Sequence, residues 1–250
     1  MTNQIILKKS NAILENCNLN ISGSKSISQR ALIIQFLNSH YLELNNLSDS
    51  NDTKTLSEIL KEIKKKNKIN VGQGGTTFRF LVPLLSLIDK EFQIDGHSTL
   101  NSRPFLGLVN ALKQFGVKFK FFAQNSHFPF KIHGGEMVSK LVTIESNKTS
   151  QFVSGLLLIG PYIKGGLKLK LNTKTVSSSY IEMTIQMMRI CGANVSYDKK
   201  LIFVKEGGYS SIIKNIESDW TSLSYIYECI AISNKAEITV SSFRYQIGRA

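Results

Sequence analysis

The sequence is poor in the residues that a disulfide framework or a structural zinc site requires. Its 250 residues contain 3 cysteines, Cys17, Cys191 and Cys229, which lie far apart and outside any Cys-x-x-Cys spacing. No apolar run is long enough for a signal peptide at the N-terminus or for a bilayer span later in the chain. We therefore expect a cytoplasmic protein with no membrane attachment.

Acidic residues are also scarce relative to basic ones. The chain has 18 Asp and Glu against 31 Lys and Arg, a formal net charge of +13. Such a balance predicts an acidic partner: nucleic acid, a membrane surface or a phosphorylated metabolite. Composition alone does not distinguish among these three.

Several common site motifs are missing. The four histidines have neither a spacing suited to a metal nor an obvious nucleophile to serve. The glycine-rich segment 72–75 lacks the lysine and hydroxyl order of an ATP-binding P-loop. The lysine-rich stretch 61–68 contains no aromatic residue on which a base could stack, so we interpret it as a solvated helix end rather than a nucleic-acid patch.

Helix-like and strand-like periodicities alternate along the chain in a repeated order. Residues 69–133 predict a strand, helix 76–88, strand 91–96, helix 104–115 and closing strands 117–122 and 128–133. Residues 141–205 predict the same order, with strands 141–146 and 167–172, helices 149–162 and 178–191, and closing strands 193–198 and 201–205. The apolar face of the helix at 178–191 is expected to carry Tyr180, Met183, Met187 and Ile190.

Residues 18–68 begin in the same way, with helices near 27–38 and 52–65 around a strand at 41–47. The closing strand pair is absent there. The sequence therefore predicts an α/β fold of three βαβαββ units, the first one shortened, with mixed sheets covered by helices.

Each predicted unit enters its first helix through a short segment of small polar residues: 23–30, 71–79 and 145–151, with a fourth such segment at 173–180. Glycine lets a ligand approach the backbone, and Ser or Thr can cap the helix and hydrogen-bond a phosphate. Any one of these segments is more often a capped helix start without a ligand. Four together, three of them with a nearby Lys or Arg, favour an anionic ligand.

For three further charged residues, the sequence allows two different roles. Arg103 precedes Pro104, which suits the first position of the next helix, and an arginine there either clamps a phosphate or carboxylate or is a solvated loop charge. Asp49 and Asp52 could form a carboxylate pair for acid–base chemistry. N-capping of the helix at 52–65 is the favoured prediction for both.

Taken in order, these motifs resemble those of the 5-enolpyruvylshikimate-3-phosphate synthase family. The matching stretches are Gly23 to Arg30, Asn46 to Thr53, Gly75 to Arg79, Arg103 with Pro104, Ser150 to Phe152, Ser177 to Ile181 and Glu217 to Ser222. The resemblance implies an enolpyruvyl transferase of the shikimate pathway, which leads to chorismate and the aromatic amino acids. It implies two small-molecule substrates, shikimate 3-phosphate and phosphoenolpyruvate, and no metal or organic cofactor, nucleic acid or membrane partner.

The resemblance also implies roles for individual residues. Lys25 would contact both substrates and act in catalysis, with Ser26 and Arg30 on the shikimate part and Arg30 pairing its carboxylate. The phosphate of shikimate 3-phosphate would be held by Thr149, Ser150 and Ser177, and Tyr180 would pack near its ring. Gln151 would lie between the two ligands, and Gly75 with Arg103 would hold the phosphoenolpyruvate phosphate.

The resemblance finally implies two domains and a missing part. Residues 21–218 would form a nearly complete second domain, in units of about 21–68, 69–140 and 141–218, and residues 1–20 with 219–250 a fragment of the first domain. The family continues beyond this length, so we expect a C-terminally truncated member with weak or absent turnover alone. The helix at 219–233 and the strand at 236–240 would then lack their full domain and favour self-association.

Two alternatives stay open. The chain could be a non-catalytic binding module, or part of a split enzyme that a complementing C-terminal fragment completes. It could also be a basic RNA-binding protein built on similar repeated units, although no basic–aromatic surface pattern supports this.

Overall fold

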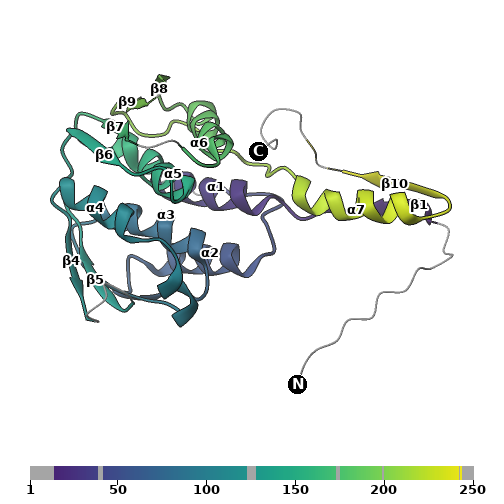
Figure 1. Ribbon diagram of the computed structural model, residues 1–250, viewed down its shortest axis with the longest axis horizontal. Helices are drawn as coiled ribbons and strands as arrows, with labels where there is room; N and C mark the ends of the chain where they lie inside the picture. Colours follow the sequence, from purple (N-terminus) through teal and green to yellow (C-terminus); the bar gives the residue numbers. More distant parts are fainter. Residues whose placement is uncertain are drawn as a thin grey trace.

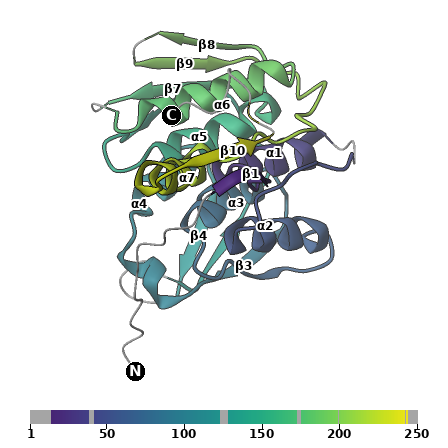
Figure 2. The same ribbon diagram turned by 90° about the vertical axis from the view of Figure 1, so that its right-hand side faces the viewer.

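The computed structural model describes residues 14–38, 42–122, 128–172, 175–198, 200–241 and 243. Its body has two four-stranded mixed sheets with helices α1, α3 and α5 between them (Figures 1 and 2). The first sheet has the order β2-β3-β5-β4, in which β2 and β3 are parallel and β5 is antiparallel to both of its neighbours. The bounds of its strands are β2 Lys68–Asn70, β3 Glu91–Asp95, β4 Lys118–Phe121 and β5 Phe130–His133.

The second sheet repeats the first in strand order and direction, as β6-β7-β9-β8. Its strands are β6 Leu141–Ile144, β7 Leu167–Leu171, β8 Val195–Asp198 and β9 Leu201–Val204. The helices between the strands are α3 Gly75–Ser86 and α4 Leu106–Gln114 in the first case, and α5 Ser150–Ile159 and α6 Ser178–Ile190 in the second. Short 3₁₀ turns, η1 Ser98–Ser102 and η2 Gly160–Tyr162, complete the connections. The predicted α/β class and two full βαβαββ units are confirmed.

The first unit departs from the prediction in its sheet. Its helices are α1 Lys25–Asn38 and α2 Asn51–Glu62. The strand expected at 41–47 is wrong over 42–47, where Asn45 makes only an isolated bridge to Asn215, and residues 39–41 lie outside the described part of the chain. The cause is local, because Asn46 adopts a φ of +56°, which interrupts an extended backbone.

The three central helices form the core of the body. Helices α1, α3 and α5 contact one another, and each is buried on nearly every side, as the unbroken buried stretches 27–34 and 152–159 illustrate. Burial on nearly every side places these helices in the interior of the body. Gly155 permits the close approach of α5 to α3, since a Cβ atom there would lie 2.6 Å from the carbonyl oxygen of Arg79. Ile190 at the end of α6 is an exception to the predicted burial, with 53% exposure.

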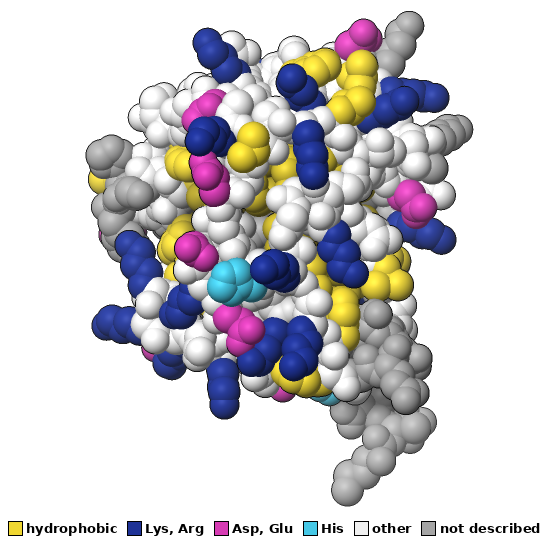
Figure 3. All heavy atoms as spheres, turned by 90° about the vertical axis from the view of Figure 1, so that its left-hand side faces the viewer, with side chains coloured by type: hydrophobic (Ala, Val, Ile, Leu, Met, Phe, Trp, Pro, Cys, Tyr) yellow, Lys and Arg dark blue, Asp and Glu magenta, His cyan; other side chains and the backbone are white. Residues whose placement is uncertain are grey.

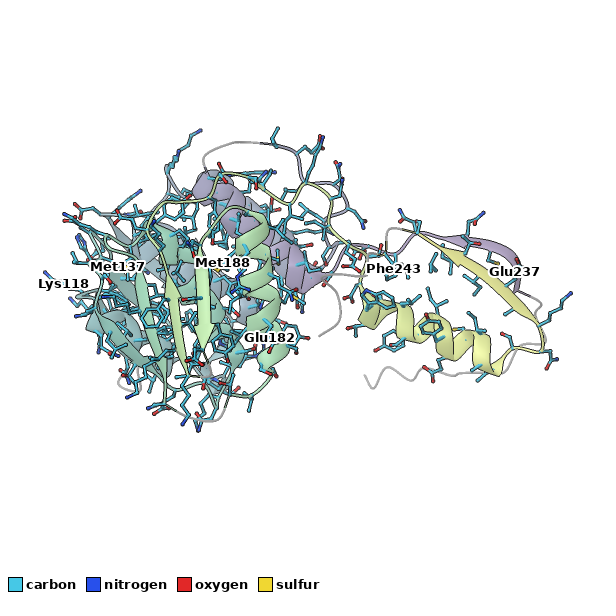
Figure 4. All side chains as sticks on the ribbon, turned by 90° about the horizontal axis from the view of Figure 1, so that it is seen from above. Lys118, Met137, Glu182, Met188, Glu237 and Phe243 are labelled. Carbon is cyan, nitrogen blue, oxygen red and sulfur yellow. The ribbon has the colours of Figure 1, made fainter. Side chains whose placement is uncertain are left out.

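An arm projects from the body (Figures 1 and 4). It consists of α7 Trp220–Ile232 and the parallel pair β1 Leu14–Leu19 and β10 Ala236–Val240, which confirms the helix and the strand predicted near the C-terminus. The chain crosses between arm and body where Gly23 bridges Ser218. A side chain at Gly23 would collide with the carbonyl oxygen of Asn46, so glycine is required at this crossing.

Candidate anion-binding site

A hollow of about 370 Å³ opens where four helices begin. Its lining comes from the first turns of α1, α3, α5 and α6 and from the residues just before them: Lys25, Ser26, Arg30, Thr76, Lys148, Thr149, Ser150, Gln151, Val176, Ser177 and Tyr180. The structure thus brings together seven of the nine site residues that the sequence predicts. Gly75 and Arg103 are not among the lining residues and form a neighbouring cluster.

The convergence of helix N-termini makes this hollow electropositive before any side-chain charge is counted. The first N–H groups of a helix have no partner within the helix, and its dipole places a partial positive charge at that end. At α5, the Thr149 hydroxyl accepts one of these groups, the N–H of Gln151, at 3.2 Å. The remaining first-turn N–H groups leave a site suited to an anion.

Arg30 contributes a buried positive charge at the floor of the hollow. Its side chain is fixed by bonds to neutral acceptors: Nε donates to Thr184 Oγ1 at 2.7 Å and Nη1 to the carbonyl oxygen of Ser26 at 2.7 Å. Nη2 donates to Ser154 Oγ at 3.3 Å and to the carbonyl oxygen of Tyr180 at 3.4 Å. Four of the five N–H groups of the guanidinium are therefore occupied, and one on Nη1 is left over.

The charge of Arg30 is costly where it lies. The residue is 2% exposed, and burial lowers the pKa of the guanidinium to about 10, so it is still protonated at pH 7. Its Cζ atom lies 5.0 Å from the ring centroid of Phe80 and 5.9 Å from that of Tyr180, which gives partial compensation. Among the described residues no carboxylate pairs with it, so an anion in the hollow would offset this cost.

Lys25 lies at the rim of the hollow and has an acidic neighbour. Its Nζ is 3.7 Å from Asp52 Oδ2, and its side chain is half exposed. The predicted capping role of Asp49 and Asp52 is wrong, because Ser50 is the N-cap of α2 and accepts the N–H of Thr53. A serine at the N-cap leaves Asp52 in the first helical turn, from which its side chain reaches Lys25.

Asp49 has a different partner. Its Oδ1 accepts a hydrogen bond from the hydroxyl of Ser22 at 3.0 Å, so it joins the segment before α2 to the crossing between arm and body. The two aspartates therefore face different groups. They do not form a carboxylate pair for acid–base chemistry.

Gln151 connects the hollow with the helix start of the second unit. Its Oε1 accepts from Arg79 Nη1 at 2.7 Å, and its Nε2 donates to Thr76 Oγ1 at 2.9 Å. These two bonds fix which end of the amide faces which group. Burial, followed by the charge of Arg103, lowers the pKa of Arg79 to about 10.

Gly75 and Arg103 lie against each other beside the hollow. A Cβ atom on Gly75 would be 2.5 Å from Arg103 Nη1 and 3.1 Å from Arg79 Nη1, so the missing side chain makes room for two guanidinium groups. Helix α4 begins at Leu106 with Phe105 as its N-cap, so the predicted first-position role of Pro104 is wrong. The carbonyl oxygen of Pro104 instead accepts from Arg79 Nε and Nη2, at 3.1 and 2.8 Å.

Ser177 occupies an unusual backbone conformation at the start of α6. Its φ of +54° and ψ of +49° are left-handed, a region that costs a residue with a side chain about 1 kcal/mol or more. Residues held in such a conformation concentrate at functional sites. Ser177 is exposed, whereas Ser150 on the facing helix is 5% exposed.

Sequence reasoning missed three lining residues, Thr76, Lys148 and Val176. Thr76 belongs to a predicted segment but received no role, and its hydroxyl is the partner of Gln151. Lys148 directly precedes the Thr149 cap. A basic residue just before a capped helix start was the available signal.

Other kinds of site find no support in the described ranges. They contain no group of three or more His, Cys, Asp or Glu that could hold a metal ion. None of the helices in these ranges combines the length and the apolar character that crossing a membrane demands. Fold and hollow together define an α/β protein of repeated units with an electropositive hollow, suited to a small anion, at converging helix N-termini.

Comparison with known proteins identifies the family to which this chain belongs. The family model for EPSP synthase (3-phosphoshikimate 1-carboxyvinyltransferase) matches residues 14–72 and 64–249. The chain belongs to the EPSP synthase family. A 3-phosphoshikimate 1-carboxyvinyltransferase of Bacteroides fragilis is 36% identical over 229 residues, and one of Tolumonas auensis is 27% identical over 248 residues.

Solved structures agree on the fold. An EPSP synthase from Acinetobacter baumannii superposes with a TM-score of 0.73 at 18% identity, covering 94% of this chain and 58% of that one. The enolpyruvyl transferase NikO from Streptomyces tendae superposes with a TM-score of 0.63 at 13% identity, covering 92% and 58%. The match to the Bacteroides fragilis protein covers 91% of this chain and 55% of the relative, so the chain spans about half the length of its relatives.

Proposed function

We propose that this chain binds shikimate 3-phosphate in the hollow and takes part in the transfer of the enolpyruvyl group of phosphoenolpyruvate to the 5-hydroxyl of that substrate. The supporting observation is the charge of the lining, which contains Lys25, Arg30 and Lys148 but no carboxylate. Shikimate 3-phosphate carries one carboxylate and a phosphate of about −1.5 to −2 charge. Three cations and four helix N-termini complement such a ligand.

The proposed orientation follows from the donors at each end of the hollow. The phosphate lies against Thr149, Ser150 and Ser177, at the starts of α5 and α6. The carboxylate accepts the remaining Nη1 N–H of Arg30, in one hydrogen bond rather than two, since the other N–H groups of this residue are engaged. The ring of the ligand packs on Tyr180, and Ser26 bonds its hydroxyl groups.

Phosphoenolpyruvate is proposed to lie beside the first ligand, with its phosphate at Gly75 and Arg103. Gln151 stands between the two positions, and Lys25 reaches both. In the reaction, the 5-hydroxyl of shikimate 3-phosphate loses its proton as its oxygen forms a bond to C2 of phosphoenolpyruvate, and a proton adds at C3. The tetrahedral intermediate then expels phosphate by C–O cleavage and loses a proton from C3. Lys25 assists this proton movement, and the other residues contribute positioning and charge stabilisation. The proposal needs no metal or organic cofactor.

A second candidate is that this chain supplies shikimate 3-phosphate binding to an enzyme that another polypeptide completes. The observation that favours it is the coverage of 55% of the Bacteroides fragilis relative. In this version, residues 21–218 act as the binding domain, and residues 1–20 with 219–250 dock a complementing fragment. A cytoplasmic location stays a prediction from the cysteine content.

Calorimetric titration of the purified chain tests binding. We expect shikimate 3-phosphate to bind at least about tenfold more tightly than shikimate, because loss of charge-assisted hydrogen bonds costs about 1.5–3 kcal/mol. Absence of any heat or spectral change at millimolar shikimate 3-phosphate would contradict the proposal. A second assay separates the two candidates. It measures phosphate release in the presence of both substrates, with and without a second chain that covers the rest of the relatives' length. Full activity of the purified chain alone would exclude the second one.

A further inference from the structure

Lys148 has no assigned role, yet it lines the hollow. It precedes Thr149, the N-cap of α5, and shares the lining with Ser150 on its own side and with Ser177 and Tyr180 at the start of α6. The backbone after it turns directly into the helix, so its side chain leaves from the phosphate end of the proposed site. Lys148 therefore lies at the same end of the hollow as the hydroxyl groups that are proposed to hold the phosphate.

The charge inventory of the lining distinguishes Lys148 from the other two cations. Arg30 already makes four hydrogen bonds within the protein. Lys25 lies 3.7 Å from the carboxylate of Asp52 and so already has an acidic neighbour. Within the described ranges no carboxylate lies within ion-pairing distance of Lys148. Of the three cations of the lining, it is the one that has neither a carboxylate neighbour nor a hydrogen bond within the described part of the chain.

The remaining phosphate ligands are neutral. Thr149, Ser150 and Ser177 offer hydroxyl groups, and the helix starts offer backbone N–H groups and a partial charge only. A phosphate monoester at neutral pH carries close to two negative charges. Hydroxyl groups alone leave that charge without a full counter-charge.

We infer that Lys148 pairs with the phosphate of shikimate 3-phosphate and makes the hollow selective for the phosphorylated ligand over shikimate. This inference rests on the proposed function and adds a specificity-determining residue to it. An ammonium group that pairs with a phosphate at a concave, electropositive surface forms a charge-assisted hydrogen bond. Its removal is expected to weaken binding about tenfold, more than the loss of an ordinary exposed ion pair.

The test compares three variants of the chain. Lys148→Ala removes the charge, and Lys148→Arg keeps it. Lys118→Ala is the matched control, because Lys118 is likewise exposed but lies on β4, far from the arm side of the body (Figure 4). Because Lys148 is exposed, we expect all three variants to fold, and thermal unfolding checks this. Each is titrated with shikimate 3-phosphate, shikimate and inorganic phosphate.

We expect Lys148→Ala to lose about tenfold in affinity for shikimate 3-phosphate and to keep its affinity for shikimate within about twofold. Lys148→Arg should recover most of the loss, and Lys118→Ala should match the wild-type chain. If the wild type binds shikimate 3-phosphate and Lys148→Ala binds it equally well, the inference is wrong while the proposed function stands. If the wild type responds to none of the ligands, both are wrong. A Lys148-dependent response to inorganic phosphate without selectivity for shikimate 3-phosphate would support the phosphate contact and overturn the proposed function.

Discussion

At the scale of single residues, the hollow combines several features that cost stability. Arg30 is a buried cation with neutral partners, and Ser177 is a non-glycine residue in the left-handed region. Neither is explained by packing of the isolated chain. Both become reasonable if a bound anion compensates the charge and the left-handed turn aims the start of α6 at it.

Replacing Ser177 by glycine tests this interpretation. Ser177→Gly should raise the free energy of unfolding by about 0.5–1 kcal/mol, because glycine adopts the left-handed conformation without a steric penalty. Ser177→Ala, which keeps the strain, should give no such gain, and both variants should bind shikimate 3-phosphate more weakly through loss of the hydroxyl. Urea unfolding measures the first effect and calorimetry the second. Equal stability of the two variants would show that the backbone is not strained.

The cysteines are predicted to differ in reactivity. Burial raises the pKa of the Cys191 thiol to about 11, whereas Cys229 is exposed on α7. At pH 8, a thiol reagent should label Cys229 rapidly and Cys191 only as fast as the protein opens. Above pH 9 the unfolded chain ionises this thiol and the native chain does not, so the contribution of Cys191 to stability falls as the pH approaches 11. Simultaneous labelling of both cysteines in the native protein would contradict the buried position.

The residues that sequence reasoning misjudged are those whose role depends on a neighbour from another helix. Asp52 resembles a helix cap in sequence, and only the approach of α1 makes it a partner of Lys25. Lys148 in sequence is one more lysine of a basic chain, and the facing start of α6 makes it a lining residue. The hydroxyl-rich segments were easier to predict, since Ser, Thr and Gly at helix starts have local causes.

At the scale of helices and strands, periodicity predicted most of the fold. The alternation in 167–171 and the apolar face of 105–115 have local physical causes, and β7 and α4 follow them. The strand expected at 41–47 failed because the positive φ of Asn46 interrupts the extended backbone, so the distant segment 214–218 forms one isolated bridge with it, Asn45 to Asn215, rather than a ladder. Gln114 illustrates another long-range contact, since its side-chain amide bonds both the N–H and the carbonyl group of Thr143 on the edge strand β6.

Two glycines on neighbouring helices give a matched prediction about packing. Gly155→Ala places a Cβ atom 2.6 Å from a backbone oxygen of α3, which cannot move without separating the helices. We expect a loss of about 2–3 kcal/mol in the free energy of unfolding. Gly75→Ala meets the ends of Arg103 and Arg79, which can shift, so its loss should stay below about 1 kcal/mol. Urea unfolding of both variants measures these two losses. Similar losses in the free energy of unfolding would contradict the proposed packing.

At the scale of the whole molecule, the excess of basic residues does not form one continuous basic surface on the face seen in Figure 3. The face seen in Figure 3 carries scattered basic side chains interleaved with acidic ones rather than a continuous basic patch. On the β3–β5–β4 surface, Lys131 pairs with Glu91 at 2.6 Å and His133 approaches Asp89 at 3.3 Å. Such an arrangement gives no support to the RNA-binding alternative, because an extended nucleic acid is bound by an unbroken basic surface.

The arm is predicted to mediate self-association of the purified chain. Tyr225, Cys229 and Ile232 are exposed at i, i+4 and i+7 of α7, and Tyr225 and Ile232 are 67% and 60% exposed. Sedimentation velocity should therefore show a weight-average mass that rises with concentration. Tyr225→Ser combined with Ile232→Ser should reduce this rise, whereas Val138→Ser, an exposed apolar residue of the body, should not. A concentration-independent monomer would disprove the prediction.

The central claim is that one hollow, formed by four helix starts, binds shikimate 3-phosphate. Mapping of backbone amide NMR shifts during titration with this ligand tests it most directly. The predicted result is a set of saturable shift changes confined to residues 24–30, 75–77, 148–151 and 176–180, the segments that line or adjoin the hollow. Changes spread over the lysines of β4 and β5, or no saturation at millimolar ligand, would contradict it.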